Sequence, residues 1–530
     1  MENFRYNNYD FNECTAKGSC SILPNVSAIQ EIMLVLIREL SHYVKKLKRL
    51  NFDMPNLELK ILHVLSEYIS VAEFTDDDVL FTLQALNKDL NILKRKYNSI
   101  CKKKNITCSE ISDFVTLEKF TTLPEIISLG EKLYLKKITK LTKEEKFYTD
   151  TLLIALKSLS SNILKLLDYK IESPDAIDKI LDSLNLFNFG KFPLERIKKY
   201  IPNIAKIEHE LLQKRAEMQM SKFGTISEVS VSSSTRKNHA VLVSGSSMSD
   251  LYDFLEFTKD IEDLDVYSHG DLIIAHAFKK FKVFKNFVGH YGTGNENCIF
   301  DFATFPGAIL LTRHSKQNIE NLIRGRIYTM DTVQPKGAIK VNNKEFNKIV
   351  ESSKSAKGFK KGQTRPEVHV GIDFKKLDLE ILKLRKKIEK NEIKKVLIVG
   401  MSQNAPLTNS YLNDVIDKLS DKIAIISFSS QKLNKPHLAL NIASNYPLMY
   451  IIVSKILEQI DISKLCFYLL KCDPVAISAI IQLKNYGAPQ ILMSSCSPMV
   501  MNPTTLEQFA QKYKVHLSTS QEKDIAEIER

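Results

Sequence analysis

Histidines, serines and other small polar residues directly follow four short apolar runs of the sequence. These polar segments are residues 268–271, 313–315, 400–404 and 429–432. If the apolar runs are parallel β-strands, the segments lie at the carboxyl ends of the strands, where open α/β sheets bind their ligands. An imidazole with carboxylates can hold a metal ion, and a serine hydroxyl beside a base can act as a nucleophile. The pattern therefore predicts a polar ligand-binding edge.

Two common functional motifs are missing from this part of the sequence. Neither Ser402 nor Ser430 stands in a G-x-S-x-G sequence, which argues against a serine hydrolase. The Gly-Thr-Gly run at 292–294 lacks the third glycine of the dinucleotide-binding fingerprint. The sequence thus gives little support to serine-catalysed hydrolysis or to nucleotide binding.

From residue 27 to about residue 215 the sequence is typical of successive amphipathic helices. Ser27 is expected to be the N-cap of the first of these helices. Thr142, followed three residues later by Glu145, has the pattern of a capping box before a leucine-rich helix. The segments 174–186 and 193–216 continue the helical periodicity. We therefore predict an N-terminal helical bundle.

The composition changes to Ser, Thr and Val around residues 224–239, which marks a boundary. Beyond it, short apolar runs alternate with helical stretches, and the runs are 240–244, 264–267, 308–312, 395–399, 423–428, 466–470 and 490–493. This alternation is typical of parallel sheets covered by helices. The predicted fold class is multidomain α + α/β, in which the helical bundle is followed by two Rossmann-like parallel-sheet domains. The expected domains are residues 1–223, 239–366 and 370–530.

The composition limits the partners that the chain is expected to have. The net charge of the 530 residues is +13, but basic runs such as 278–285 and 383–395 contain acidic or apolar residues, as solvated helix faces do. No nucleic-acid-binding motif occurs, so a nucleic-acid partner is not indicated, while a protein partner stays open. Residues 1–10 are polar and no apolar run reaches the roughly 20 residues of a membrane span, so we expect a cytoplasmic protein without a membrane partner. The eight cysteines are expected to be thiols.

Six segments match a known protein family in their order and spacing. They are Cys-Thr-Ala-Lys-Gly-Ser-Cys at 14–20, Val-Leu-Val-Ser-Gly at 241–245, the run 266–276 that begins Val-Tyr-Ser-His-Gly-Asp, Gly-His-Tyr-Gly at 289–292, Asp-Phe-Ala-Thr-Phe-Pro-Gly-Ala-Ile-Leu-Leu-Thr at 301–312, and Arg-Ile-Tyr-Thr at 326–329. Together they resemble the hybrid cluster proteins, also called hydroxylamine reductases or prismane proteins. The resemblance covers most of the chain. It implies a three-domain fold with a 4Fe-4S cluster in the N-terminal domain and a hybrid iron–sulfur–oxygen cluster at the domain interface.

The resemblance also implies which residues stand at the ligand positions of the family. In the family, one His, two Glu and four Cys hold the hybrid cluster. The His corresponds to His269, and the two glutamates correspond to Asp301 and Asp473. The four cysteines correspond to Ser315, Ser402, Ser430 and Ser444. Of the N-terminal cluster cysteines only Cys14 and Cys20 have counterparts, so residues 1–20 resemble a degenerate iron–sulfur region.

The change from thiol to hydroxyl at four ligand positions decides the chemistry that we expect. A thiolate ionises near neutral pH and is a soft iron ligand, whereas an alcohol stays protonated and is a poor substitute. Four other cysteines are predicted near this region but off the matched positions, namely Cys298, Cys466, Cys472 and Cys496. We therefore predict a hydroxylamine reductase-like protein without iron–sulfur clusters, catalytically inactive and with a binding or scaffolding role.

Two alternatives stay open. The first is a metalloenzyme in which His269, Asp301 and Asp473 hold one iron, manganese or zinc ion without sulfur, with His314 as a further imidazole. Against it, the shorter Asp side chains move each ligand oxygen by more than the tolerance of roughly 0.2 Å in metal–ligand distances. The second is residual reduction of hydroxylamine or nitric oxide, as an oxidoreductase of the family's type.

Overall fold

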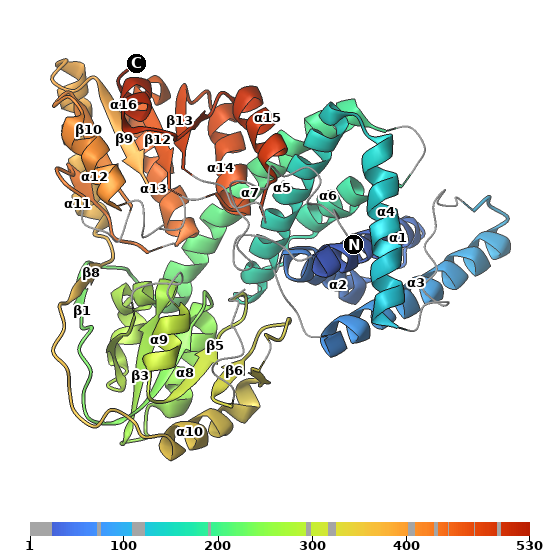
Figure 1. Cartoon of the computed structure of the whole chain (residues 1–530), viewed down its shortest axis with the longest axis horizontal. Coiled ribbons are helices and arrows are strands. Elements are labelled where there is room, and N and C mark those ends of the chain that lie inside the picture. Colours follow the sequence, from blue (N-terminus) through green and yellow to red (C-terminus); the bar gives the residue numbers. More distant parts are fainter. Residues whose placement is uncertain are drawn as a thin grey trace. The chain divides into compact units, whose positions relative to one another are not determined.

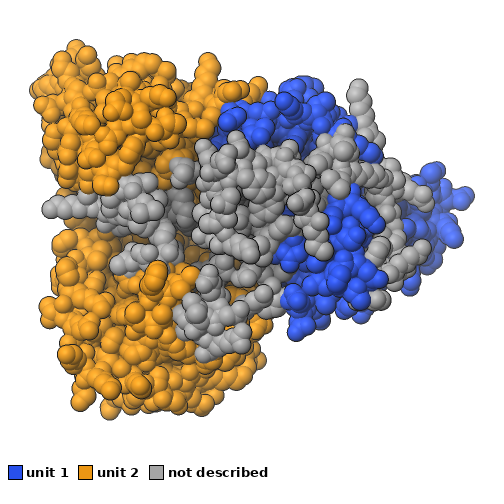
Figure 2. All heavy atoms as spheres, viewed as in Figure 1, with its two compact units in different colours: residues 1–208, 497–509 blue, residues 209–496, 510–530 orange. Residues whose placement is uncertain are grey.

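The structure is a computed structural model that describes residues 24–70, 76–108, 122–188, 192–292, 298–315, 325–335, 337–400, 409–428, 433–443, 445–470, 472–494 and 500–530. The chain divides into two compact units, which Figure 2 draws in different colours. The first unit comprises residues 1–208 and 497–509, and the second comprises residues 209–496 and 510–530. The three domains expected from the sequence, at 1–223, 239–366 and 370–530, remain a proposal.

The first unit is built from long helices, because apolar residues recur along the chain at helical spacing. These helices are α1 (Pro24–Lys48), α2 (Pro55–Ser66), α3 (Asp76–Lys104), α4 (Leu123–Lys140), α5 (Lys143–Leu167), α6 (Pro174–Asn185) and the first part of α7 (Leu194–Phe223), coloured from blue to green in Figure 1. Helix α3 begins with three aspartates and ends with three lysines, charges that complement the helix dipole. Its buried residues, from Val79 to Cys101, form one stripe.

Two helix starts test the capping predictions. The Thr142 hydroxyl accepts a hydrogen bond from the amide of Glu145, and the Glu145 carboxylate accepts one from the amide of Thr142, so the capping box is confirmed. Ser27, in contrast, is not an N-cap, because α1 already begins at Pro24 and Ser27 is buried inside the helix. Proline suits the first helical turn because that turn leaves its amides unpaired.

The first sheet belongs to the second unit and contains six parallel strands in the order β4-β3-β2-β5-β6-β7. The strands are β2 (His239–Ser244), β3 (Leu264–His269), β4 (Phe287–His290), β5 (Ala308–Leu311), β6 (Ile327–Thr329) and β7 (Ile339–Lys340). Helices α8 (Met248–Thr258), α9 (Cys298–Thr304) and α10 (Phe346–Ser355) accompany them, together with the 3-10 helices η3 (Gly270–Ala277), η4 (Lys279–Val283) and η7 (Asn343–Glu345). The strand order reverses at β2, which pairs with β3 on one side and β5 on the other.

The second sheet also contains six parallel strands, in the order β11-β10-β9-β12-β13-β14. The strands are β9 (Lys395–Val399), β10 (Ile423–Ser427), β11 (Leu438–Ala439), β12 (Leu465–Leu469), β13 (Gln490–Met493) and β14 (His516–Leu517). The helices of this part are α11 (Phe374–Glu389), α12 (Asn409–Lys418), α13 (Tyr446–Gln459), α14 (Pro474–Asn485), α15 (Pro503–Tyr513) and α16 (Gln521–Glu529). Strands and α12 enclose a buried core that includes Leu397, Val415 and Tyr468.

The fold class predicted from the sequence is confirmed, since a helical part precedes two parallel sheets. A short antiparallel pair, β1 (Val229–Val231) with β8 (Val368–Val370), was not predicted. One boundary differs as well, because β3 extends through His269 and the polar segment 268–271 therefore begins inside the strand. Among the described residues, no helix combines the length and the apolar character that crossing a membrane requires.

Candidate functional site

His269 lies at the carboxyl end of β3 and is fully buried. The parallel register of β2 and β3 places Ser244 beside it, with the Ser244 Oγ 2.8 Å from Nδ1 of His269. On the other side of the ring, Nε2 lies 3.2 Å from Oδ2 of Asp301, which α9 supplies. A carboxylate only accepts hydrogen bonds, so Nε2 carries a proton and donates it to Asp301. Both ring nitrogens of His269 are therefore engaged.

At Gly292 the backbone passes close to the side chains of this histidine–aspartate pair. Its φ of +94° is one that residues with a side chain rarely adopt. A Cβ at this position would lie 2.9 Å from Cδ2 of His269 and closer still to Oδ2 of Asp301. Glycine is thus required here both for the backbone conformation and for the space that the pair occupies.

Two more histidines, the partly buried His276 and the buried His290, lie beside the pair. The Ser268 Oγ is 3.0 Å from Nε2 of His276 and 3.1 Å from Nδ1 of His290. Burial lowers the pKa of His276 to about 3 and lowers the pKa of His290 well below its usual value, with the neighbouring histidines adding to the effect at His290. Both rings are therefore neutral at physiological pH. The His290 ring is stacked on that of His269 at a centroid distance of 6.4 Å.

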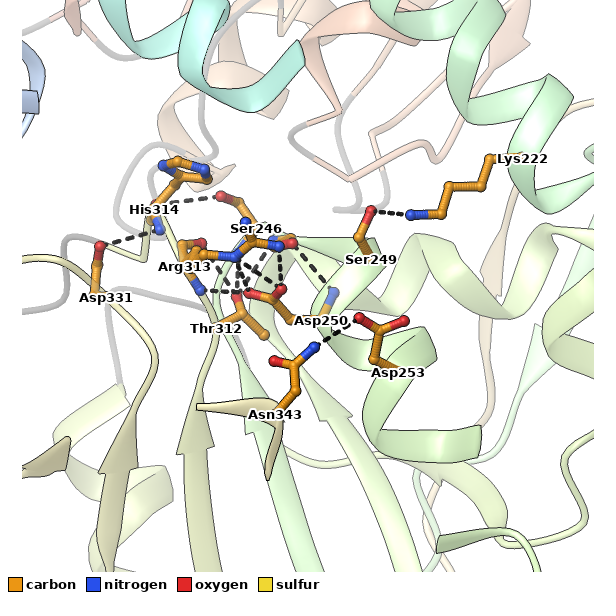
Figure 3. Close-up of polar contacts among 11 residues, drawn as sticks. Lys222, Ser246, Ser249, Asp250, Asp253, Thr312, Arg313, His314, Asp331 and Asn343 are labelled. Atoms are coloured by element: carbon orange, nitrogen blue, oxygen red, sulfur yellow. Dashed lines mark hydrogen bonds and ion pairs between the residues drawn. The ribbon is translucent and has the colours of Figure 1, made fainter. Parts of the chain in front are cut away.

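The segment after β5 is held by two buried carboxylates, as Figure 3 shows. The Arg313 guanidinium binds the fully buried Asp250, with Nε 2.9 Å from Oδ1, and the Arg313 amide donates to Oδ2 of Asp250. Asp331 follows β6 and accepts hydrogen bonds from the amides of His314 and Ser315. Asp331 also accepts a hydrogen bond of 3.1 Å from the Ser315 hydroxyl. The hydroxyl at this predicted ligand position is therefore committed to Asp331.

Thr312 connects this segment to the start of α8. Its Oγ1 accepts hydrogen bonds from the amides of Ser246 and Ser247, at 3.1 and 3.2 Å. The Ser246 hydroxyl in turn donates to the carbonyl oxygen of His314. The carboxyl ends of β2 and β5, where the strand order reverses, are thus cross-linked by hydrogen bonds.

Asp473 precedes α14, in the part of the chain that forms the second sheet. Its Oδ1 accepts a hydrogen bond of 2.8 Å from the amide of Ala476, so Asp473 is the N-cap of α14. Its Oδ2 accepts a hydrogen bond from the hydroxyl of Tyr446. The structure therefore brings two of the three predicted metal-binding residues together, His269 and Asp301, and shows Asp473 as a helix cap.

Several predicted positions lie outside the described residues, namely Cys14, Cys20, Ser402, Ser430, Ser444 and Cys496. Of the other cysteines, Cys466 is fully buried in β12, and burial raises the pKa of its thiol to about 12. Cys298 is buried in the apolar core of the first sheet. Cys472 takes part in a disulfide bond, so the expectation that all eight cysteines are thiols is wrong.

The sequence interpretation placed Ser268 in the polar segment 268–271 but did not identify Ser244, Asp250 or Asp331 as part of this region. Ser244 and Ser268 stand within or directly after predicted strands, and only the pairing of β2 with β3 shows that Ser244 reaches His269. Asp331 follows β6, a three-residue strand without a clear sequence signal. The sequence signal that could have identified Asp331 is its position as the first carboxylate after the Arg-Ile-Tyr-Thr run.

A family model described as the Prismane/CO dehydrogenase family matches residues 10–435. The chain belongs to this family. Its curated relatives include the hydroxylamine reductase of Zymomonas mobilis, 23% identical over 97% of this chain and 96% of the relative. The hydroxylamine reductase of Rhodospirillum rubrum is 22% identical over 79% of this chain and 76% of the relative. A solved alpha subunit of acetyl-CoA synthase/carbon monoxide dehydrogenase with NiZn[Fe4S4] and NiNi[Fe4S4] clusters gives a TM-score of 0.47 at 9% identity, covering 97% of this chain and 83% of that chain.

Membership of the prismane family implies iron–sulfur clusters, and the described residues do not suit such a group. The hydroxyl of Ser315 is bonded to Asp331, and Nε2 of His269 carries a proton that it donates to Asp301. Asp473 caps a helix. Among the described residues, no three His, Cys, Asp or Glu side chains are grouped so that they could hold a metal ion. The donor set is one of hydrogen-bonded oxygens and a protonated ring nitrogen, which are poor ligands for sulfide-bridged iron.

Proposed function

We propose that this chain is a prismane-family protein that assembles neither iron–sulfur cluster and that acts by binding rather than by reducing hydroxylamine. The observation that carries the proposal is the hydrogen bond between Ser315 and Asp331. Ser315 stands where the family has a cluster cysteine, and its hydroxyl, in place of a thiolate, is satisfied by a buried carboxylate. Serines stand at the three other cysteine positions, Ser402, Ser430 and Ser444.

The other family ligand positions support the same proposal. His269 uses both ring nitrogens in hydrogen bonds to Ser244 and Asp301, so a metal ion would have to displace a proton from Nε2. Asp473 would have to release the amide of α14 and the Tyr446 hydroxyl. A network in which each polar group already has a partner is stable without a metal ion, since a buried polar group is costly only when it is unpaired.

Anaerobic reconstitution with iron and sulfide tests the proposal. The hydroxylamine reductase of Zymomonas mobilis, taken through the same treatment, is the positive control. We expect this chain to retain neither iron nor acid-labile sulfide, to show no visible absorption band, and to reduce neither hydroxylamine nor nitric oxide with a reduced viologen dye. Stoichiometric iron and sulfide together with a visible band would overturn the proposal, and activity would establish the residual-reductase alternative.

The short distance between His269 and Asp301 favours a second candidate, a sulfur-free metal site completed by Asp473. Metal analysis after dialysis against iron, manganese or zinc distinguishes this candidate from the first. Because His269 is the only nitrogen donor in the proposed triad, His269→Ala should abolish bound metal if the candidate is right. Equal metal content in the wild type and in His269→Ala would exclude it.

A further inference from the structure

Helix α11 carries two exposed leucines on the face opposite to the side chains that it buries in the protein core. Leu377, Ile381 and Leu384 are buried, and α11 packs against α13. Leu379 is 60% exposed and Leu382 is 40% exposed. At 100° per residue, both leucines lie on the side of the helix opposite to the buried stripe. This outer face is therefore not part of the core.

Lysines flank the two leucines on this outer face. Lys375 and Lys386 stand one turn before Leu379 and one turn after Leu382, at the i, i+4, i+7 and i+11 positions of one face, and both lysines are exposed. Lys390 extends the row by one further turn. The outer face of α11, defined as Lys375, Leu379, Leu382, Lys386 and Lys390, thus consists of leucine and lysine alone.

The acidic residues of α11 do not neutralise this face, because each of them is in an ion pair with another residue. Asp378 binds Lys455, Glu380 binds Lys383 and Glu389 binds Arg385. Among the described residues, no ion pair joins Lys375, Lys386 or Lys390 to an acidic side chain.

The surrounding sequence increases the positive charge. Residues 353–395 contain 14 Lys and Arg against 6 Asp and Glu, while the net charge of the whole chain is +13. More than half of the net positive charge is therefore carried by this one segment. Much of the segment is exposed, so its charge is available to an anionic partner.

We infer that the outer face of α11 binds the surface of an anionic phospholipid bilayer. The leucines enter the boundary between headgroups and acyl chains, and the lysines contact the anionic headgroups. A nucleic acid would use the lysines but would leave two leucines without a partner, and this face offers no aromatic ring on which a base could stack. The inference is independent of the proposed function, since it holds whether or not the chain binds a cluster.

Vesicle flotation of the full chain tests this inference. We expect binding to phosphatidylcholine vesicles that contain phosphatidylserine, no binding to pure phosphatidylcholine, and weaker binding as the salt concentration rises. Leu379→Ser with Leu382→Ser should lower the partition coefficient roughly 30-fold, from the apolar area that both side chains would lose. Lys375→Gln with Lys386→Gln should lower it by a similar factor, roughly 30-fold.

Matched control variants come from α3, which also has exposed apolar and basic residues. Phe81, 73% exposed, is changed to serine, and Lys102 and Lys103 are changed to glutamine. Neither control should alter flotation. Equal binding of the wild type to both kinds of vesicle, or a loss in the α3 variants as large as in the α11 variants, would overturn the inference. A loss of vesicle binding in the lysine variant but not in the leucine variant would also overturn the inference, because it would show electrostatic adsorption without insertion of the leucines.

A spectroscopic measurement avoids any dependence on loss of binding. The chain contains no tryptophan, so Leu379→Trp introduces a single reporter at the proposed contact. We expect its emission to shift to shorter wavelength with vesicles that contain phosphatidylserine and to be quenched by brominated acyl chains. An unchanged emission spectrum would contradict insertion, whatever the flotation result.

Discussion

Gly292→Ala tests the packing of the backbone against His269 and Asp301. The substitution has two effects that can be separated. Alanine at a φ of +94° is strained, by about 1–2 kcal/mol. In addition, its Cβ would overlap the Asp301 carboxylate and approach His269 to 2.9 Å, so Asp301 has to move. Moving Asp301 disrupts a hydrogen bond to a charged group, which contributes about 1.5–3 kcal/mol. We expect a total loss of about 2.5–5 kcal/mol in the free energy of unfolding.

Gly487→Ala is the matched control for this prediction. Gly487 has a φ of +92°, and nothing lies within 4 Å of the point that a Cβ would occupy there, so the control carries the strain without the overlap. The difference between the two variants in urea unfolding, followed by circular dichroism, isolates the contribution of the histidine–aspartate pair. We expect Gly292→Ala to be less stable than Gly487→Ala by about 2 kcal/mol or more. Equal losses would refute the reasoning, since they would show that Asp301 adjusts without leaving His269.

Three further predictions concern His276, Asp331 and Cys466 of the second unit. Because burial lowers the pKa of His276 to about 3, the unfolded chain binds more protons below the usual histidine pKa, so the free energy of unfolding should fall as the pH falls from about 6.5 to about 4. His276→Gln should reduce that slope by up to about 1.4 kcal/mol per pH unit, measured by urea unfolding at several pH values. Asp331→Asn should lower the free energy of unfolding by about 2 kcal/mol, because the carboxylate accepts bonds from the Ser315 hydroxyl and three amides. Asp263→Asn, which removes only an exposed ion pair with Lys354, should lower it by less than about 1 kcal/mol. Burial raises the pKa of the Cys466 thiol to about 12, so this thiol should not react in the folded protein. Titration with a thiol reagent should therefore count the same number of thiols in the folded wild type and in folded Cys466→Ala, and one fewer in the variant after both are unfolded. A difference between the two folded proteins would contradict this prediction.

The sequence was sufficient to predict the central strands of both sheets but not the edge strands. Within the predicted runs 240–244 and 395–399, residues 240–243 and 396–399 are continuously apolar, because a central parallel strand is buried on both faces. Strands β7, β11 and β14 have only two residues each, and their pairing is decided by the neighbouring strand rather than by a local pattern. Propensity over two residues carries too little information to identify such strands.

The residues of the candidate site that belong to a sequence motif were predictable, whereas a residue that strand pairing brings to the site was not. His269 and Asp301 were identified, and they lie in contact. Ser244 was not, because its contact with His269 depends on which strand lies beside β3 and in which register. The outer face of α11 was missed for a different reason. Leu379 and Leu382 belong to a leucine-rich amphipathic helix, and the sequence alone does not show which leucines face the core.

The pairing of Ser315 with Asp331 explains why a hydroxyl suits this position better than a thiolate. Asp331 is only 5% exposed, and its Oδ2 lies 3.1 Å from the Ser315 oxygen. A thiolate in the same place would stand next to a buried carboxylate, and two like charges at that distance oppose each other's ionisation. A thiol at position 315 would therefore stay protonated, and a protonated thiol is a poor iron ligand. The serine and the aspartate fit each other as donor and acceptor, so a hydroxyl at position 315 suits the residues that surround it.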